Sequence, residues 1–100
     1  MDNQPRAVIV GAGPNGLTAA ARLAMAGWSV DIYERADWAG GAAASSAEIF
    51  PGTIVDLGAA GHPFGVASPA FHALDLESHG LRWLNAPYPM AHPLEGAPAG

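Results

Sequence analysis

The segment VIVGAGPNGL, residues 8–17, joins an apolar run directly to three closely spaced glycines. The β-branched run that begins at Ala7 is typical of a central parallel strand buried on both faces. Of the glycines, Gly11 would permit a tight turn out of this strand, Gly13 would let a ligand approach the backbone, and Gly16 would let a helix pack closely on the strand. The segment therefore predicts a strand, a glycine-rich turn and a helix.

The helix predicted after the turn has clear boundaries. Pro14 suits its first turn, because the missing N–H would be unpaired there, and Gly27 suits its C-terminal end. Residues 30–33 predict a second strand, which ends on Glu34. A strand, a helix and a strand within about thirty residues predict a right-handed βαβ unit.

The turn and the acid together indicate a dinucleotide site. The helix N-terminus has unpaired N–H groups and a partial positive charge, which suit a pyrophosphate. Glu34 follows the glycines by about 20 residues, where a carboxylate can accept the hydroxyls of an adenosine ribose and would repel a 2′-phosphate. A GxGxxG match is common by chance in a chain rich in glycine and alanine, and an acid at a strand end is often only solvated. The strand before the glycines and the helix after them favour dinucleotide binding.

The residues after the acid favour one dinucleotide over another. The doublet Gly40-Gly41 comes where the chain could return across the pyrophosphate. Residues 43–49 and 53–57 then predict two strands around a proline–glycine turn. A nicotinamide-binding fold usually continues straight into another helix and strand, so the hairpin favours a flavin.

A second helix is predicted further along the chain. Ser68 and Pro69 have the residue types of an N-cap and a first helical position, and Gly80 suits the end of the helix. Residues 81–84 predict a short strand. After them, frequent prolines exclude a regular helix.

Residues 8–43 resemble the long FAD fingerprint of flavoproteins with a glutathione-reductase-like FAD domain. The chain looks most like the phytoene dehydrogenase-like branch, which includes carotenoid desaturases and isomerases. The similarity continues more loosely through FPGTIVDLGAAGHPF at 50–64, LDLESHGLRW at 74–83 and PYPMAHPL at 87–94. It implies an α/β fold with a partial Rossmann-like FAD/NAD(P)-binding domain of the glutathione-reductase type. It also implies that the chain is the N-terminal fragment of an FAD-dependent oxidoreductase.

The resemblance further implies which residues contact the cofactor. Those expected to bind FAD are Gly11, Gly13, Pro14, Asn15, Gly16, Glu34, Arg35, Gly40, Gly41 and Ala42. Among them, Glu34 would hold the ribose and Arg35 would lie beside the adenine. Ala42 departs from the pattern, since many relatives carry Arg after the glycine doublet. This departure argues against the amine oxidase branch but not against FAD, because the backbone donors remain. No catalytic residue can be named.

The implied activity is flavin-mediated dehydrogenation or isomerisation of a small hydrophobic substrate, with a polyene as one candidate. An amine oxidase-like flavoenzyme, an NAD(P)-dependent dehydrogenase and a non-catalytic nucleotide-binding protein on the same fold remain open. We expect this chain alone to be inactive, because it holds little of any substrate pocket.

Residues 1–100 are interpreted as the N-terminal part of the FAD-binding domain. The βαβ fingerprint is assigned to residues 6–42, and a hairpin and loop to residues 43–67. A helix and strand are assigned to residues 68–84, and a Pro-rich segment toward a substrate domain to residues 85–100.

Composition excludes several other classes of protein. The net charge is −5 and the few arginines are scattered, so no basic patch predicts nucleic acid. The chain has no cysteine, which excludes a dithiol pair and thiolate metal sites within it. Its histidines lack nearby paired acids at ligand spacing, so no metal is predicted. No apolar run has the length of a membrane span, and the first residues do not resemble a signal peptide. A cytoplasmic protein is expected, with peripheral membrane contact only through parts outside this chain.

Overall fold

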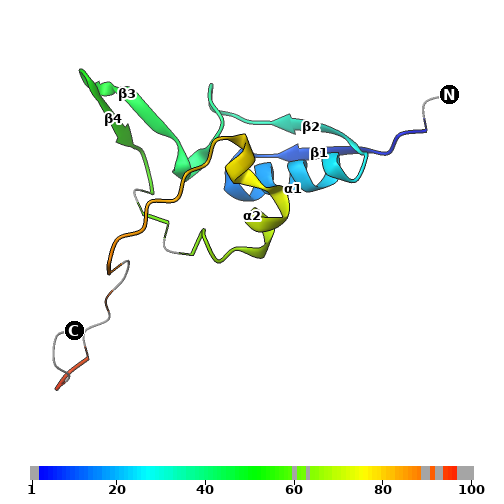
Figure 1. Cartoon of the computed structure of the whole chain (residues 1–100). Coiled ribbons are helices and arrows are strands. Elements are labelled where there is room, and N and C mark those ends of the chain that lie inside the picture. Colours follow the sequence, from blue (N-terminus) through cyan, green and yellow to red (C-terminus); the bar gives the residue numbers. More distant parts are fainter. Residues whose placement is uncertain (1–2, 60, 63, 89–90, 92–93, 97–100) are drawn as a thin grey trace.

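The computed structural model of the chain describes residues 3–59, 61–62, 64–88, 91 and 94–96 (Figure 1). Its elements, in chain order, are β1 (Arg6–Val10), α1 (Pro14–Met25), β2 (Ser29–Tyr33), the 3-10 helix η1 (Gly41–Ala43), β3 (Ser45–Phe50), β4 (Thr53–Asp56), α2 (Pro69–Leu74) and the 3-10 helix η2 (Leu76–His79). The strands form two separate two-stranded sheets, β1 with β2 and β3 with β4.

The βαβ unit predicted from the sequence is confirmed. β1 and β2 are parallel and in register, with Ile9 opposite Ile32. α1 connects them and packs on both strands. The helix ends at Met25, two residues before Gly27, which has a φ of 87° and donates its N–H to the carbonyl of Ala24 at 3.0 Å. A left-handed glycine at this place is a common way to close a helix.

The predicted hairpin is also confirmed. β3 and β4 are antiparallel, and Phe50 pairs with Thr53 across the turn. Gly52 takes a φ of 77° in that turn, a conformation that glycine adopts without steric cost. The hairpin projects away from the β1–β2 sheet (Figure 1), and the chain reaches it through η1.

The second helix differs from its prediction. Ser68 caps it as expected, since its hydroxyl accepts the N–H of Phe71 at 3.4 Å. The α-helix stops at Leu74, however, because Asp75 is left-handed with a φ of 48°, and η2 follows before Gly80. Aspartate tolerates this conformation better than most residues, since its short polar side chain can bond locally.

The strand predicted at residues 81–84 is wrong. No helix or strand forms there, and residues 81–84 pair with none of the described strands. The Leu81 N–H instead donates to the Leu76 carbonyl at 3.1 Å and closes the turn after η2. Trp83 packs its ring against Gly65. β-propensity without a neighbouring strand does not make a strand.

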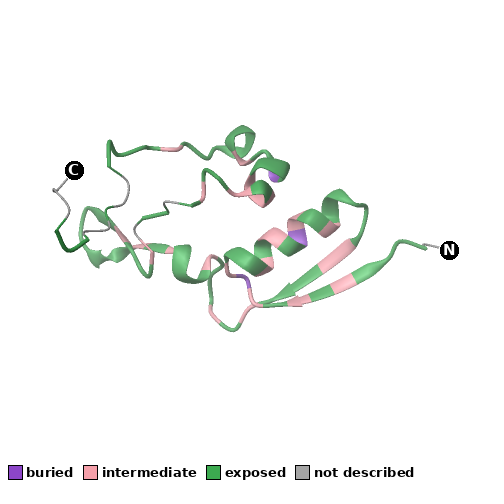
Figure 2. Cartoon of the chain, turned by 90° about the horizontal axis from the view of Figure 1, so that it is seen from below, coloured by how far each residue is buried: buried purple, intermediate pink, exposed green. Residues whose placement is uncertain are grey.

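Burial is low, and this corrects the expectation that β1 is buried on both faces. α1 covers one face of the sheet, while Val8 and Val10 on the other face are 63% and 87% exposed. Among the described residues only Ala12, Ala20 and Leu74 are buried (Figure 2). The radius of gyration is 17.8 Å, against about 13 Å for a compact domain of this length. Packing between elements of the chain is centred on α1, which contacts β1, β2 and α2.

Candidate dinucleotide-binding site

The glycine-rich turn begins where β1 ends. Gly11 has a φ of 99°, which favours glycine, and its N–H donates to the Tyr33 carbonyl at 2.7 Å. This bond continues the pairing of β1 with β2 into the turn. The chain can therefore leave the strand sharply while its first residue stays tied to the end of β2.

Gly16 sets the distance between α1 and β1. A Cβ at this position would collide with the carbonyl of Gly11 and would lie 3.3 Å from Cγ2 of Ile9. Real Cβ atoms do not fit at such separations from backbone, so α1 can lie this close to the turn only with glycine here. The closeness brings the first turn of α1 directly onto the end of the strand.

Gly13 is the open position of the turn. It is the N-cap of α1 with extended backbone, and no described atom lies within 4 Å of the place where its Cβ would be. The N–H groups of Asn15 and Gly16, in the first turn of the helix, have no intrahelical acceptor, whereas Pro14 has no N–H to offer. Unpaired donors and the positive end of the helix dipole make this a place for an anionic group.

Glu34 lies against this turn. One carboxylate oxygen, Oε2, accepts the N–H of Ala12 at 2.7 Å, and the other, Oε1, accepts the N–H of Ala36 at 3.1 Å. These two bonds, that from Ala12 first, hold the pKa of Glu34 below its ordinary value of 4.5. The carboxylate is therefore ionised at neutral pH and half-buried beside the glycines.

The glycine doublet returns to the same turn. The N–H of Gly40 donates to the Ala12 carbonyl at 2.7 Å, and a Cβ on Gly41 would lie 3.0 Å from the Cα of Gly13. Both glycines have positive φ, 120° and 55°. Ala42 follows in η1, and Gly58 after β4 lies so close that a Cβ there would be 2.9 Å from the Ala42 carbonyl oxygen.

The structure thus brings most of the predicted site residues together. The glycine turn, Glu34 and residues 40–42 converge from three separate places in the sequence. Arg35 is exposed, and the described contacts give it no bond to the turn. Ala12 was not predicted as a site residue. In the structure it is 4% exposed, and its backbone is hydrogen-bonded to both Glu34 and Gly40. A small residue between two glycines was the only signal for it.

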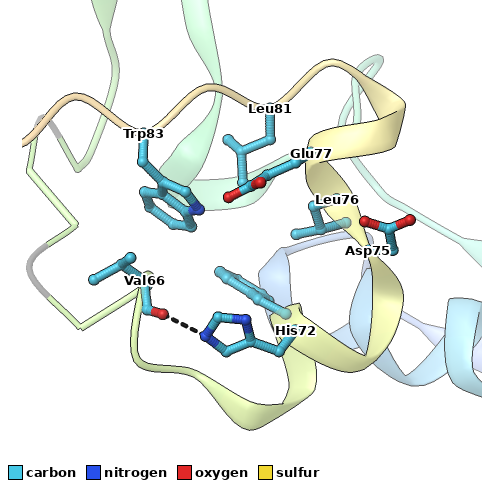
Figure 3. A pocket seen from close by; sticks show the side chains of 9 residues that line it. Val66, His72, Asp75, Leu76, Glu77, Leu81 and Trp83 are labelled. Carbon is cyan, nitrogen blue, oxygen red and sulfur yellow. Dashed lines mark hydrogen bonds between the residues drawn. The ribbon is translucent and has the colours of Figure 1, made fainter.

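Two hollows lie beside α2. One, of about 430 Å³, lies between the N-terminal part of α1, at Pro14 and Thr18, and residues that include His62, Phe64 and Phe71. The other, of about 230 Å³, lies between α2, η2 and Trp83 (Figure 3). There the His72 ring nitrogen Nε2 is hydrogen-bonded to the Val66 carbonyl at 2.6 Å.

Metal-binding groups do not gather in the described residues, where no three His, Cys, Asp or Glu side chains lie together as a ligand set. His92, one of the four histidines, falls outside those residues. None of the helices in the described part of the chain is long and apolar enough to cross a membrane.

The family described as "NAD(P)-binding Rossmann-like domain" matches residues 9–76. That span contains the glycine turn, Glu34 and the glycine doublet. The chain is also similar to the rat (Rattus norvegicus) "Pyridine nucleotide-disulfide oxidoreductase domain-containing protein 2", with 38% identity over 91 residues. The match covers 89% of this chain and 15% of that relative, so the chain spans a small part of the relative's length.

Proposed function

Because this chain belongs to the family of NAD(P)-binding Rossmann-like domains, we propose that it is part of an FAD-dependent oxidoreductase and supplies part of that protein's FAD-binding site. One observation carries the proposal: the glycine turn, Glu34 and the glycine doublet meet at the backbone of Ala12. Three segments far apart in the sequence build one compact set of donors beside one acidic acceptor. This is the combination that the ADP half of a dinucleotide requires.

The residues present fit the cofactor. The pyrophosphate would lie on the N–H groups of Gly13, Asn15 and Gly16, where the turn is open and positive. Glu34, ionised and close to the turn, would accept the ribose hydroxyls. In this proposal Arg35 lies near the adenine. Residues 40–42 cover the pyrophosphate from the other side, with Ala42 contributing backbone only.

The element that follows β2 supports FAD over a nicotinamide dinucleotide. Both cofactors contain the same ADP half, so the glycine turn does not separate them. The chain leaves β2 through Gly40 and Gly41 and enters the hairpin of β3 and β4, rather than another helix and parallel strand. The doublet is thereby brought back onto the turn. In this proposal it contacts the pyrophosphate of the flavin nucleotide from the side opposite the turn.

Bound FAD supplies two-electron or hydride chemistry, and the protein supplies position and electrostatics. We propose a hydrophobic substrate, in keeping with the resemblance to phytoene dehydrogenase-like proteins, and we assign residues 1–100 to the N-terminal part of the FAD-binding domain. The name of the rat relative supports an oxidoreductase in general. This chain holds no residue to which we assign proton transfer.

The cofactor itself tests the proposal. The purified full-length protein, denatured, should release FAD that is identified by mass. The folded protein should show a flavin absorption spectrum. Release of NAD or NADP, or no bound nucleotide after incubation with FAD, would contradict the proposal. A nicotinamide cofactor would favour the dehydrogenase alternative, and no nucleotide would favour a non-catalytic relative of the fold.

A further inference from the structure

Both backbone polar groups of Ala12 are bonded to residues far along the chain. The Ala12 N–H donates to Oε2 of Glu34 at 2.7 Å, and its carbonyl accepts the N–H of Gly40 at 2.7 Å. Both distances are short for N–H···O bonds. Ala12 is also 4% exposed, and its bond to Glu34 is partly buried. We name these three residues, Ala12, Glu34 and Gly40, the Ala12 clamp.

The bonds of the Ala12 clamp affect which backbone N–H groups of the turn remain free to bind a ligand. The Gly11 N–H is bonded to Tyr33 and the Ala12 N–H to Glu34. The N–H groups left for a phosphate are those of Gly13 and of the first helical turn. The clamp therefore separates donors that fix the turn from donors that bind a ligand.

We infer that Glu34 is a positioning residue for the pyrophosphate turn, acting through Ala12, in addition to the ribose contact proposed above. The inference rests on the proposed function. A turn held before the ligand arrives loses less conformational freedom on binding, which improves affinity. Gly40 completes the clamp from the other side, and its φ of 120° is one that glycine adopts readily.

The two roles of Glu34 are compatible. Each oxygen of an ionised carboxylate can accept two hydrogen bonds. The bonds from Ala12 and Ala36 use one position on each oxygen. The remaining positions can accept ribose hydroxyls without release of the clamp.

Ligands with and without ribose hydroxyls separate the two roles. The full-length protein that contains this chain is stripped of cofactor, and its binding of ADP and of 2′,3′-dideoxy-ADP is measured by calorimetry. Wild type is compared with Glu34→Ala, Glu34→Gln and the control Glu48→Gln, which changes an exposed acid on β3. Glu34→Ala should weaken 2′,3′-dideoxy-ADP roughly tenfold, because the charge-assisted bond to Ala12 is lost although no ribose hydroxyl is present. The loss for ADP should be larger, and Glu34→Gln should lie between wild type and Glu34→Ala.

Hydrogen exchange gives a second readout that needs no ligand. The Ala12 amide of the cofactor-free protein should be protected in wild type and in Glu48→Gln, and should exchange faster in both Glu34 variants. If Glu34→Ala weakens ADP but leaves 2′,3′-dideoxy-ADP binding and Ala12 exchange as in wild type, Glu34 acts on the ribose alone and the inference is overturned. If wild type binds neither ADP nor FAD, it is the proposed function that fails.

Discussion

Gly41 has two reasons to be glycine. Its φ is 55°, and a Cβ would lie 3.0 Å from the Cα of Gly13 and 3.6 Å from Cδ of Pro14. A side chain at this position would push the doublet away from the turn. Residues 40–42 approach the turn this closely only because the doublet has no side chains.

Substitution of Gly41 by alanine should therefore weaken FAD binding. The left-handed conformation costs a non-glycine residue about 1–2 kcal/mol, and the contact with Gly13 adds to it. We expect the Kd for FAD to rise about tenfold for Gly41→Ala. The matched control is Gly61→Ala, where no described atom lies within 4 Å of the new Cβ. Equal affinities for the two variants in a fluorescence titration would contradict the close approach.

The ionisation of Glu34 makes a prediction about pH. Hydrogen bonds from the Ala12 and Ala36 N–H groups lower its pKa in the folded protein. A group with a lowered folded pKa contributes stability above its unfolded pKa, and this contribution is lost as the pH falls through the folded value. We expect the Ala12 amide resonance to titrate below pH 4.5, the ordinary value for Glu34, and not to titrate in Glu34→Gln. A midpoint at or above that value in NMR would rule out the bond as described.

At the scale of elements, local patterns in the sequence were sufficient for β1, α1, β2 and the hairpin. Each of these is specified by its own residues: an apolar run, a glycine at φ > 0, or a tight turn. The predictions failed where the secondary structure depends on neighbouring segments or on a single backbone conformation. A strand at 81–84 needs a partner strand, and the end of α2 depends on a left-handed Asp75 that no periodicity reveals.

The site shows the same division. The glycines and Glu34 follow a spacing that can be recognised in the sequence. The clamp on Ala12 could not be predicted, because it depends on backbone positions that only the folded chain brings together. The partners of a backbone N–H outside a helix are set by tertiary structure.

The packing of α1 on β1 supplies a prediction at the same scale. Gly16→Ala places a Cβ against the Gly11 carbonyl, so α1 or the turn must move. Overpacking of this kind typically costs about 1–3 kcal/mol in free energy of unfolding. Ala19→Ser, on the exposed side of α1, should cost less than about 1 kcal/mol. Thermal unfolding of the full-length protein compares the two variants, and a Gly16→Ala protein as stable as wild type would show that the helix does not lie this close.

At the scale of the whole molecule, the chain is extended and leaves much apolar surface uncovered. Its extents are 67 × 35 × 26 Å, and the free face of β1 carries exposed valines. The second edge of β1 has no partner strand in the described residues. Uncovered strand edges and apolar faces favour association.

Residues 1–100 expressed alone should therefore not behave as a working flavoprotein. We expect no cooperative thermal unfolding and no retention of FAD on gel filtration, because the buried core is very small. A monomer that unfolds cooperatively and keeps stoichiometric FAD would show that the apolar face and open edge of β1 need no additional protein to cover them.

The central claim is that the open glycine turn binds the pyrophosphate of FAD, and Gly13→Val tests it most directly. No described atom lies within 4 Å of a Cβ at Gly13, so the full-length variant should fold, with the modest loss of stability that valine brings to an N-cap. Its side chain would nevertheless occupy the space over the donors of the turn. Titration of the cofactor-free protein with FAD should give a Kd about ten- to a hundredfold above wild type, because a clash of this kind costs about 1–3 kcal/mol and about 1.4 kcal/mol is a tenfold change. A folded Gly13→Val protein that binds FAD with wild-type affinity would contradict the account.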